Sequence, residues 1–63
     1  MTPLVASFIS HRDGWRWHGA IYALHPGWSP ELVLVCAHAH RSMRQATACA
    51  ERELARARAE VGA

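Results

Sequence analysis

Four residues in the second half of the chain have the side chains of a zinc site. Cys36, His38 and His40 occupy alternate positions at the end of an apolar run, and Cys49 follows later in the chain. Alternate side chains of a strand point to one side, and two cysteines with two histidines form a common zinc ligand set. Their spacing, however, differs from that of zinc fingers, and histidines at a strand end are more often simply solvated. We therefore expect no bound metal and no other cofactor.

The remaining polar residues do not predict an enzyme. A catalytic nucleophile needs a base within hydrogen-bond reach and a third group that orients this base. Asp13 is expected to serve in a turn, and the glutamates of the helix lie among arginines on a solvated face. A chain this short also leaves little room for a substrate pocket. The sequence therefore predicts a protein without catalytic activity.

Two arginines flank the start of the predicted C-terminal helix. Arg41 and Arg44 lie where the helix dipole presents positive charge, so acidic residues there would be more stabilising by about 0.3–1 kcal/mol each. Helix N-termini bind phosphates and carboxylates, and arginine adds bidentate hydrogen bonds to either group. The alternative is that both side chains extend into solvent. We expect Arg41 and Arg44 to contribute more to partner binding than to folding.

Three apolar segments predict strands, from Leu4 to His11, from Trp15 to Leu24 and from Leu32 to His38. Asp13-Gly14 predicts a tight type I′ hairpin turn, and two prolines with a glycine predict a loop over 25–30. A capping box at Ser42 and Gln45 predicts a helix start, and the helix has an apolar face formed by Met43, Ala46, Ala50, Leu54, Ala57 and Val61. We expect one α+β domain, residues 1–63, in which a three-stranded antiparallel sheet packs on one long C-terminal helix.

A two-residue turn at Asp13-Gly14 fixes the register of the first hairpin and therefore its two faces. The face expected under the helix carries Leu4, Ala6, Phe8, Trp15, Trp17 and Ile21. The opposite face, here called the open face, carries six candidate partner-binding residues: Val5, Ile9, His11, Arg16, His18 and Tyr22. The third strand is apolar on both sides, with Leu32, Leu34 and Cys36 on one and Val33, Val35 and Ala37 on the other. Because one helix covers only one face, we expect another chain to cover the open face.

Composition narrows the classes of protein that remain. Chains of about this size usually need a metal, disulfides or a second subunit for stability. The hydrophobic content of 51% excludes a disordered chain, and a net charge of +2 without any lysine is low for a dedicated nucleic-acid-binding domain. No apolar run approaches the ~20 residues of a membrane span, and no secretory signal is visible. We expect a cytoplasmic protein without a membrane partner, in which Cys36 and Cys49 stay reduced.

The segment from His40 to Ala46, H-R-S-M-R-Q-A, follows a tryptophan-rich hairpin and resembles the arm-type DNA-binding domains of tyrosine integrases. In that family the third strand ends in a short basic turn, and the exposed sheet face enters the DNA major groove. The resemblance covers most of the chain and implies that Arg16, His18 and Tyr22 would read DNA. The family's sheet face is richer in lysine and arginine, whereas Val5 and Ile9 lie on this one, which shifts the expectation from DNA to protein.

The sequence thus predicts a protein-interaction module that binds itself as a homodimer, or a larger host protein, through its open face. Small non-enzymatic chains of this kind are common among phage and mobile-element proteins that inhibit a host machine, including anti-CRISPR proteins, and such inhibition is the expected role. The alternative is a DNA-binding domain that reads the major groove with its sheet. Salt distinguishes the two, because phosphate-driven binding weakens steeply with ionic strength.

Overall fold

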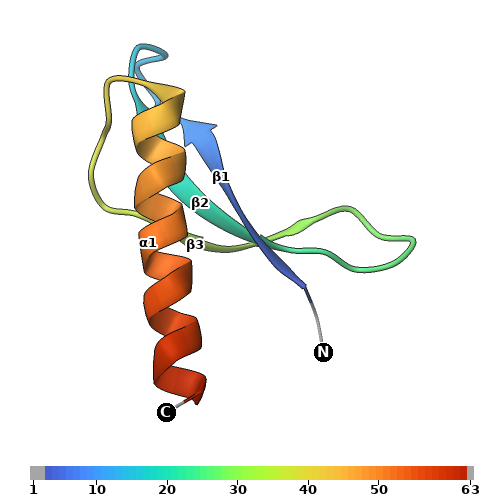
Figure 1. Ribbon diagram of the computed structural model, residues 1–63. Coiled ribbons are helices and arrows are strands. Elements are labelled where there is room, and N and C mark those ends of the chain that lie inside the picture. The colour runs from blue at the N-terminus through green and yellow to red at the C-terminus, as the bar shows by residue number, and fades with distance from the viewer. Residues whose placement is uncertain (1–2, 63) are drawn as a thin grey trace.

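The computed structural model describes residues 3–62, with side chains through residue 60, and contains three strands followed by one helix. The strands are β1 (Leu4–Ser10), β2 (Trp17–Ala23) and β3 (Glu31–Val35), and the helix is α1 (Met43–Gly62). The sheet is antiparallel in the order β1-β2-β3, and α1 lies across one of its faces (Figure 1). The α+β fold predicted from the sequence is confirmed.

The turn between β1 and β2 is longer than predicted. Gly14 has a φ of 77°. Asp13 has a negative φ, as does every other non-glycine residue that the structure describes. The Asp13 carboxylate instead accepts hydrogen bonds from the backbone N–H groups of Trp15, at 2.8 Å, and Arg16, at 3.2 Å. The type I′ prediction was wrong because the aspartate side chain stabilises a longer turn. Consequently Trp15 lies in this turn, 84% exposed, and not under the helix.

The predicted register of the first hairpin is nevertheless confirmed. The longer turn is still centred on Asp13-Gly14, so it removes equal numbers of residues from both strands. The pairs on the helix-side face are the predicted ones: Leu4 with Ala23, Ala6 with Ile21, Phe8 with Gly19 and Ser10 with Trp17. Val5 pairs with Tyr22 and Ile9 with His18 on the open face, as expected.

A small core joins α1 to β1 and β2. Ile21, Ala50 and Leu54 form its centre, and Leu4 and Ala6 pack against it. The helix starts as predicted, because the Gln45 N–H donates to Ser42 Oγ at 3.1 Å. In the predicted apolar stripe Ala46, Ala50 and Leu54 are buried, whereas Met43 and Ala57 are exposed and the side chain of Val61 lies outside the described part.

Strand β3 ends earlier than predicted and does not alternate regularly. It stops at Val35 and not at His38, and its pairing with β2 shifts between Ile21 and Tyr22. Ile21 pairs with Leu34 and Tyr22 with Leu32, so Val33 is the extra residue of a bulge. Paired residues share a face. The predicted grouping of Leu32 with Leu34 was therefore wrong, and Leu32 and Val35 join the open face while Leu34 faces the helix side.

Candidate functional site

The fold brings Cys36, His38, His40 and Cys49 into one cluster. One ligand atom of each residue lies within 4.8 Å of those of the other three. Cys36 Sγ is 3.5 Å from His40 Nε2, and Cys49 Sγ is 3.6 Å from His38 Nδ1. Both thiols are buried, His40 is half-buried and His38 is exposed. The cluster therefore lies just below the surface, with its sulfur atoms inward and one imidazole at the solvent boundary.

Backbone hydrogen bonds to β2 hold two members of this cluster in place. The Cys36 N–H donates to Gly19 O at 2.9 Å. His40 exchanges two hydrogen bonds with Trp17, at 2.7 and 2.8 Å, and forms an isolated β-bridge with it. Residues 37–39 leave the sheet between these anchors. The cluster thus forms where the chain departs from β2 and returns to it, and not by alternation along a strand that continues to His38.

Further hydrogen bonds hold both the side chain and the backbone carbonyl of Cys36 in place. The Gly19 N–H donates to Cys36 Sγ at 3.1 Å. The His18 ring nitrogen Nδ1 lies 3.1 Å from Cys36 O, which can only accept, so this nitrogen carries the proton and donates. Hydrogen bonds of this kind around a ligand residue orient it in metal sites.

Cys49 comes from the second turn of α1, on the side of the helix that faces β2. Burial raises the pKa of its thiol, and the neighbouring Cys36 raises it further through a hydrogen bond and through charge. The sequence objection to this set was its irregular spacing. The fold removes that objection. Cys49 joins the cluster because the helix packs on the sheet, so the number of residues between Cys49 and the other three ligands does not matter.

The polar residues of the open face are bound to one another. His18 donates from Nδ1, so its Nε2 accepts the proton of His11 Nδ1 at 2.7 Å. Arg16 forms an ion pair with Asp13, with 2.7 Å between Nη2 and Oδ2. The backbone hydrogen bond from Trp15 to Asp13, together with the Arg16 side chain, lowers the pKa of this carboxyl group to about 2. His11, Arg16 and His18 therefore each form at least one side-chain interaction within the chain.

The apolar residues of the open face remain partly uncovered. Val5 is exposed, and Ile9 and Tyr22 are half-buried. Val5 and Tyr22 line an open depression of about 320 Å³ together with Ser7, Phe8, Leu24 and Pro30. Five of the six predicted open-face residues lie on paired strands or beside them, and Arg16 lies in the turn. The apolar part of the predicted surface is thus assembled and accessible.

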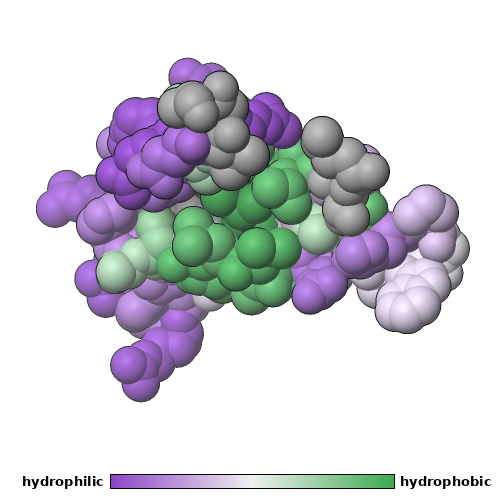
Figure 2. Space-filling model, turned by 90° about the horizontal axis from the view of Figure 1, so that it is seen from below, coloured by the Kyte–Doolittle hydropathy of each residue, from purple (hydrophilic) through white to green (hydrophobic). Residues whose placement is uncertain are grey.

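Strand β3 carries the largest run of accessible aliphatic side chains. Leu32, Val33, Leu34 and Val35 are 37–54% exposed. The outer edge of β3 has no neighbour in the described sheet, in which only β2 is hydrogen-bonded to it. On the helix side a second depression of about 260 Å³ separates Val33 and Leu34 from Leu54. Figure 2 shows hydrophobic side chains gathered in the middle of one face of the molecule, with hydrophilic side chains on either side.

The molecule exposes more surface than its mass requires. Its accessible surface is 4845 Å², whereas about 4,000 Å² is expected for a compact protein of 7.0 kDa. The radius of gyration is 12.1 Å against about 10.6 Å for a compact chain of this length. The extended shape of the chain therefore leaves more surface accessible than a compact domain of the same mass would.

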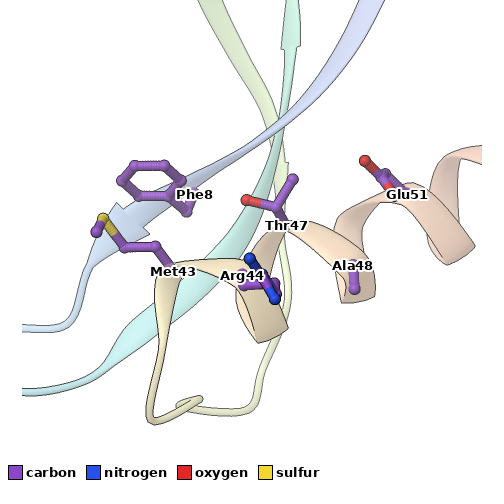
Figure 3. A pocket seen from close by; sticks show the side chains of 6 residues that line it. All are labelled: Phe8, Met43, Arg44, Thr47, Ala48 and Glu51. Carbon is purple, nitrogen blue, oxygen red and sulfur yellow. The ribbon is translucent and has the colours of Figure 1, made fainter.

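Arg41 and Arg44 do not belong to the open face. Arg44 lines a depression of about 480 Å³ on the helix side of β1. Figure 3 shows Phe8, Met43 and Thr47 around this depression, with Arg44, Ala48 and Glu51 along the helix. Arg41 is exposed in the turn before α1. The predicted partner-binding residues are therefore divided between two sides of the molecule.

Two exposed tryptophans were not predicted to take part in binding. Trp28 is 79% exposed in the loop between β2 and β3, and Trp15 is 84% exposed in the other turn. Tryptophan is enriched among the residues that dominate binding energy at interfaces. The sequence did contain a sign of this exposure. Each tryptophan follows a turn glycine, Gly14 or Gly27, and a residue in a turn does not place its side chain under the helix.

No family model, curated protein or solved structure matches this chain. Within residues 3–62, no helix combines the length and the apolar character needed to span a bilayer.

Proposed function

We propose that this chain is a non-enzymatic protein-interaction module that binds a protein partner through its open face and the adjoining strand β3. The partner is a second copy of the chain or a larger host protein. Inhibition of a host machine, as by small phage-encoded proteins, is the role we expect for such a module. The observation that carries the proposal is the exposure of Leu32 and Val35 beside the open face and of Val33 at the bulge of β3, 37–54% each.

The energetics support a protein partner. Covering a few hundred Å² of this apolar surface contributes several kcal/mol, at about 25 cal/mol per Å² and before the cost of association. The total stability of a domain this small is of the same order. A free strand edge adds backbone N–H and C=O groups with which an extended partner segment can pair.

The same face supports DNA binding less well. Arg16, which the integrase resemblance assigns to base reading, is held by Asp13 at 2.7 Å. His18 uses both ring nitrogens within the chain, toward His11 and Cys36. Reading a base would require breaking these bonds, and Val5 and Ile9 beside them carry no charge for phosphates.

Affinity capture from a host lysate, with and without nuclease, tests this proposal. We compare the natural chain with Val5→Lys/Tyr22→Glu, which places charges on the open face. The matched control is Ala55→Lys/Ala59→Glu, which places the same charges on exposed positions of α1. We expect either capture of a protein partner or dimerisation in sedimentation velocity. This association should persist after nuclease treatment and in the control variant, and it should be lost in the open-face variant.

Two results would contradict the proposal. In the first, a folded Val5→Lys/Tyr22→Glu chain binds its partner and keeps its oligomeric state as the natural chain does, so the open face is not the interface. The other is capture that disappears with nuclease and falls steeply with salt, which would assign nucleic acid as the partner.

A further inference from the structure

The Cys36–His38–His40–Cys49 cluster has a geometry that neither partner binding nor the hydrophobic core requires. Two sulfur and two nitrogen atoms from four side chains lie mutually within 4.8 Å. They come from three places: Cys36 after β3, the two histidines of the following turn, and Cys49 on α1. We propose that this cluster is a structural zinc site with one Zn²⁺ per chain.

The distances agree with tetrahedral coordination. Zinc binds cysteine sulfur at about 2.3 Å and histidine nitrogen at about 2.0–2.1 Å, so tetrahedral angles place a sulfur and a nitrogen ligand about 3.5 Å apart. Two of the four sulfur–nitrogen separations have this value: 3.5 Å for Cys36 and His40, and 3.6 Å for Cys49 and His38. Contraction of the remaining pairs from at most 4.8 Å completes the tetrahedron.

The ligands are oriented before a metal arrives. Cys36 is held by four hydrogen bonds: its N–H donates to Gly19 O, its Sγ accepts from the Gly19 N–H and donates to His38 O, and its carbonyl accepts from His18. His40 is fixed by its β-bridge to Trp17. Surrounding hydrogen bonds that orient ligands are typical of metal sites. An N–H donor at a thiolate sulfur further stabilises the charge that the sulfur carries when it binds a metal.

The donor set selects the metal and the kind of site. Two thiolates and two neutral imidazoles neutralise a divalent cation, and this soft, tetrahedral S₂N₂ set suits zinc. Four protein ligands fill the coordination sphere and leave no position for water or substrate, which is typical of structural and not catalytic zinc. Binding of Zn²⁺ to two thiols and two imidazoles releases the two thiol protons to the buffer.

The fold has a clear need for such a cross-link. Among the residues whose side chains the structure describes, the buried apolar ones other than Ile21 and Leu54 are alanines and cysteines. A chain of about 60 residues with so small a core usually relies on a disulfide, a metal or a partner. Zinc would join the end of β3 to α1 and β2, where the chain otherwise crosses from sheet to helix without large buried side chains. A Cys36–Cys49 disulfide would leave unexplained why both imidazoles approach the sulfurs.

The test begins with the reduced chain purified with zinc in the medium. Elemental analysis should find one zinc per chain, and exchange of zinc for Co²⁺ should give the intense visible bands of a tetrahedral thiolate site. Chelation should lower the melting temperature and expose both thiols to alkylation, and added Zn²⁺ alone should reverse both effects. Calorimetry in buffers of different ionisation enthalpy should detect the released thiol protons.

Ligand variants locate the metal. His38 is exposed, so His38→Ala leaves the core intact and should weaken zinc binding by about a hundredfold or more. Cys49→Ser should act likewise. The matched control is His25→Ala, which removes a histidine that pairs with Glu31 outside the cluster and should retain one zinc.

Either of two outcomes overturns the proposal. The first is a reduced, folded chain that takes up neither Zn²⁺ nor Co²⁺ stoichiometrically when either is added in excess. The second is a zinc content and affinity unchanged in both His38→Ala and Cys49→Ser. If a variant fails to fold, the cobalt spectrum and thiol protection of the natural chain still decide the question.

Discussion

Gly19 of β2 lies so close to Ala46 of α1 that a side chain on this glycine would collide with the helix backbone. A Cβ atom built on Gly19 overlaps the carbonyl oxygen of Ala46 and lies 3.0 Å from the backbone nitrogen of Ala50. Both alanines are completely buried. The helix therefore rests directly on the central strand, and this approach is also what brings Cys49 to Cys36.

Gly19→Ala should be among the most damaging single substitutions in this chain. The obstacle is backbone, which cannot rotate away, so the helix must move off β2. Overpacking of this kind costs about 1–3 kcal/mol or more, and each kcal/mol lowers the melting temperature by about 4–8 °C in a domain of this size. We expect thermal unfolding followed by circular dichroism to show a decrease above about 10 °C.

Gly27→Ala is the matched control for this substitution. Gly27 has a φ of 74°, but a Cβ there meets nothing within 4 Å. Its substitution should cost only the backbone strain, about 1–2 kcal/mol. If Gly19→Ala is tolerated as well as Gly27→Ala, the helix does not approach β2 as closely as described.

The stability of the first hairpin should depend on pH through Asp13. Its folded-state pKa is lowered to about 2 from an ordinary 3.8, mainly by the hydrogen bond from the Trp15 N–H. A carboxylate with a depressed pKa stabilises the fold above its unfolded pKa and loses this contribution as the pH falls through its folded pKa. The stability difference between the natural chain and Asp13→Asn should therefore be constant above about pH 5 and shrink between pH 4 and 2.

Melting temperatures of both proteins across this pH range provide the measurement. Glu60→Gln serves as the control for the change of net charge, because Glu60 is exposed on α1. An Asp13→Asn difference that stays the same at pH 2 and pH 6 would mean that the charge of Asp13 does not stabilise the turn.

Local signals in the sequence were sufficient for most of the fold. The Asp13-Gly14 pair gave the correct register, because the turn remained centred on it despite its different conformation. Ser42 gave the correct helix start for the same reason, since a cap requires only residues three positions apart. Both features depend on neighbours along the chain, which is why the sequence could predict them.

Features that depend on β2 as a partner could not be predicted in the same way. The bulge at Val33 and the end of β3 at Val35 follow from pairing with β2. The ligand cluster was recognised by residue type, but spacing argued against it, because Cys49 joins only when α1 packs over Gly19. A glycine within an apolar strand was the available sign of such a close approach.

Reversing the charges of Arg41 and Arg44 should preserve the fold, and it should weaken the binding of a partner that extends from the open face to the helix side, where Arg44 lies. The first turn of α1 contains no acidic residue, and both arginines are exposed. Glutamate at both positions should raise stability slightly, by about 0.3–1 kcal/mol each, through the helix dipole. Thermal melts and partner titrations compare this double variant with Arg52→Glu, an exposed mid-helix control. A clear loss of stability would instead make the two arginines structural.

The free edge of β3 should determine association, and Val33 is the residue that tests it most directly. Val33 is the most exposed aliphatic residue of this strand, at 54%, so its replacement removes little from the core. Lysine on an edge strand hinders pairing with another chain, because its charge must be desolvated when a second strand approaches. We expect Val33→Lys to keep the melting temperature of the isolated monomer within about 3 °C and to abolish self-association or partner binding. Ala55→Lys adds the same charge to the exposed side of α1 and should change neither the melting temperature nor the association.

Sedimentation velocity over a range of protein and salt concentrations provides the measurement, since association through apolar surface persists at salt concentrations that dissociate nucleic acid. Association that is unchanged in Val33→Lys would place the interface away from β3.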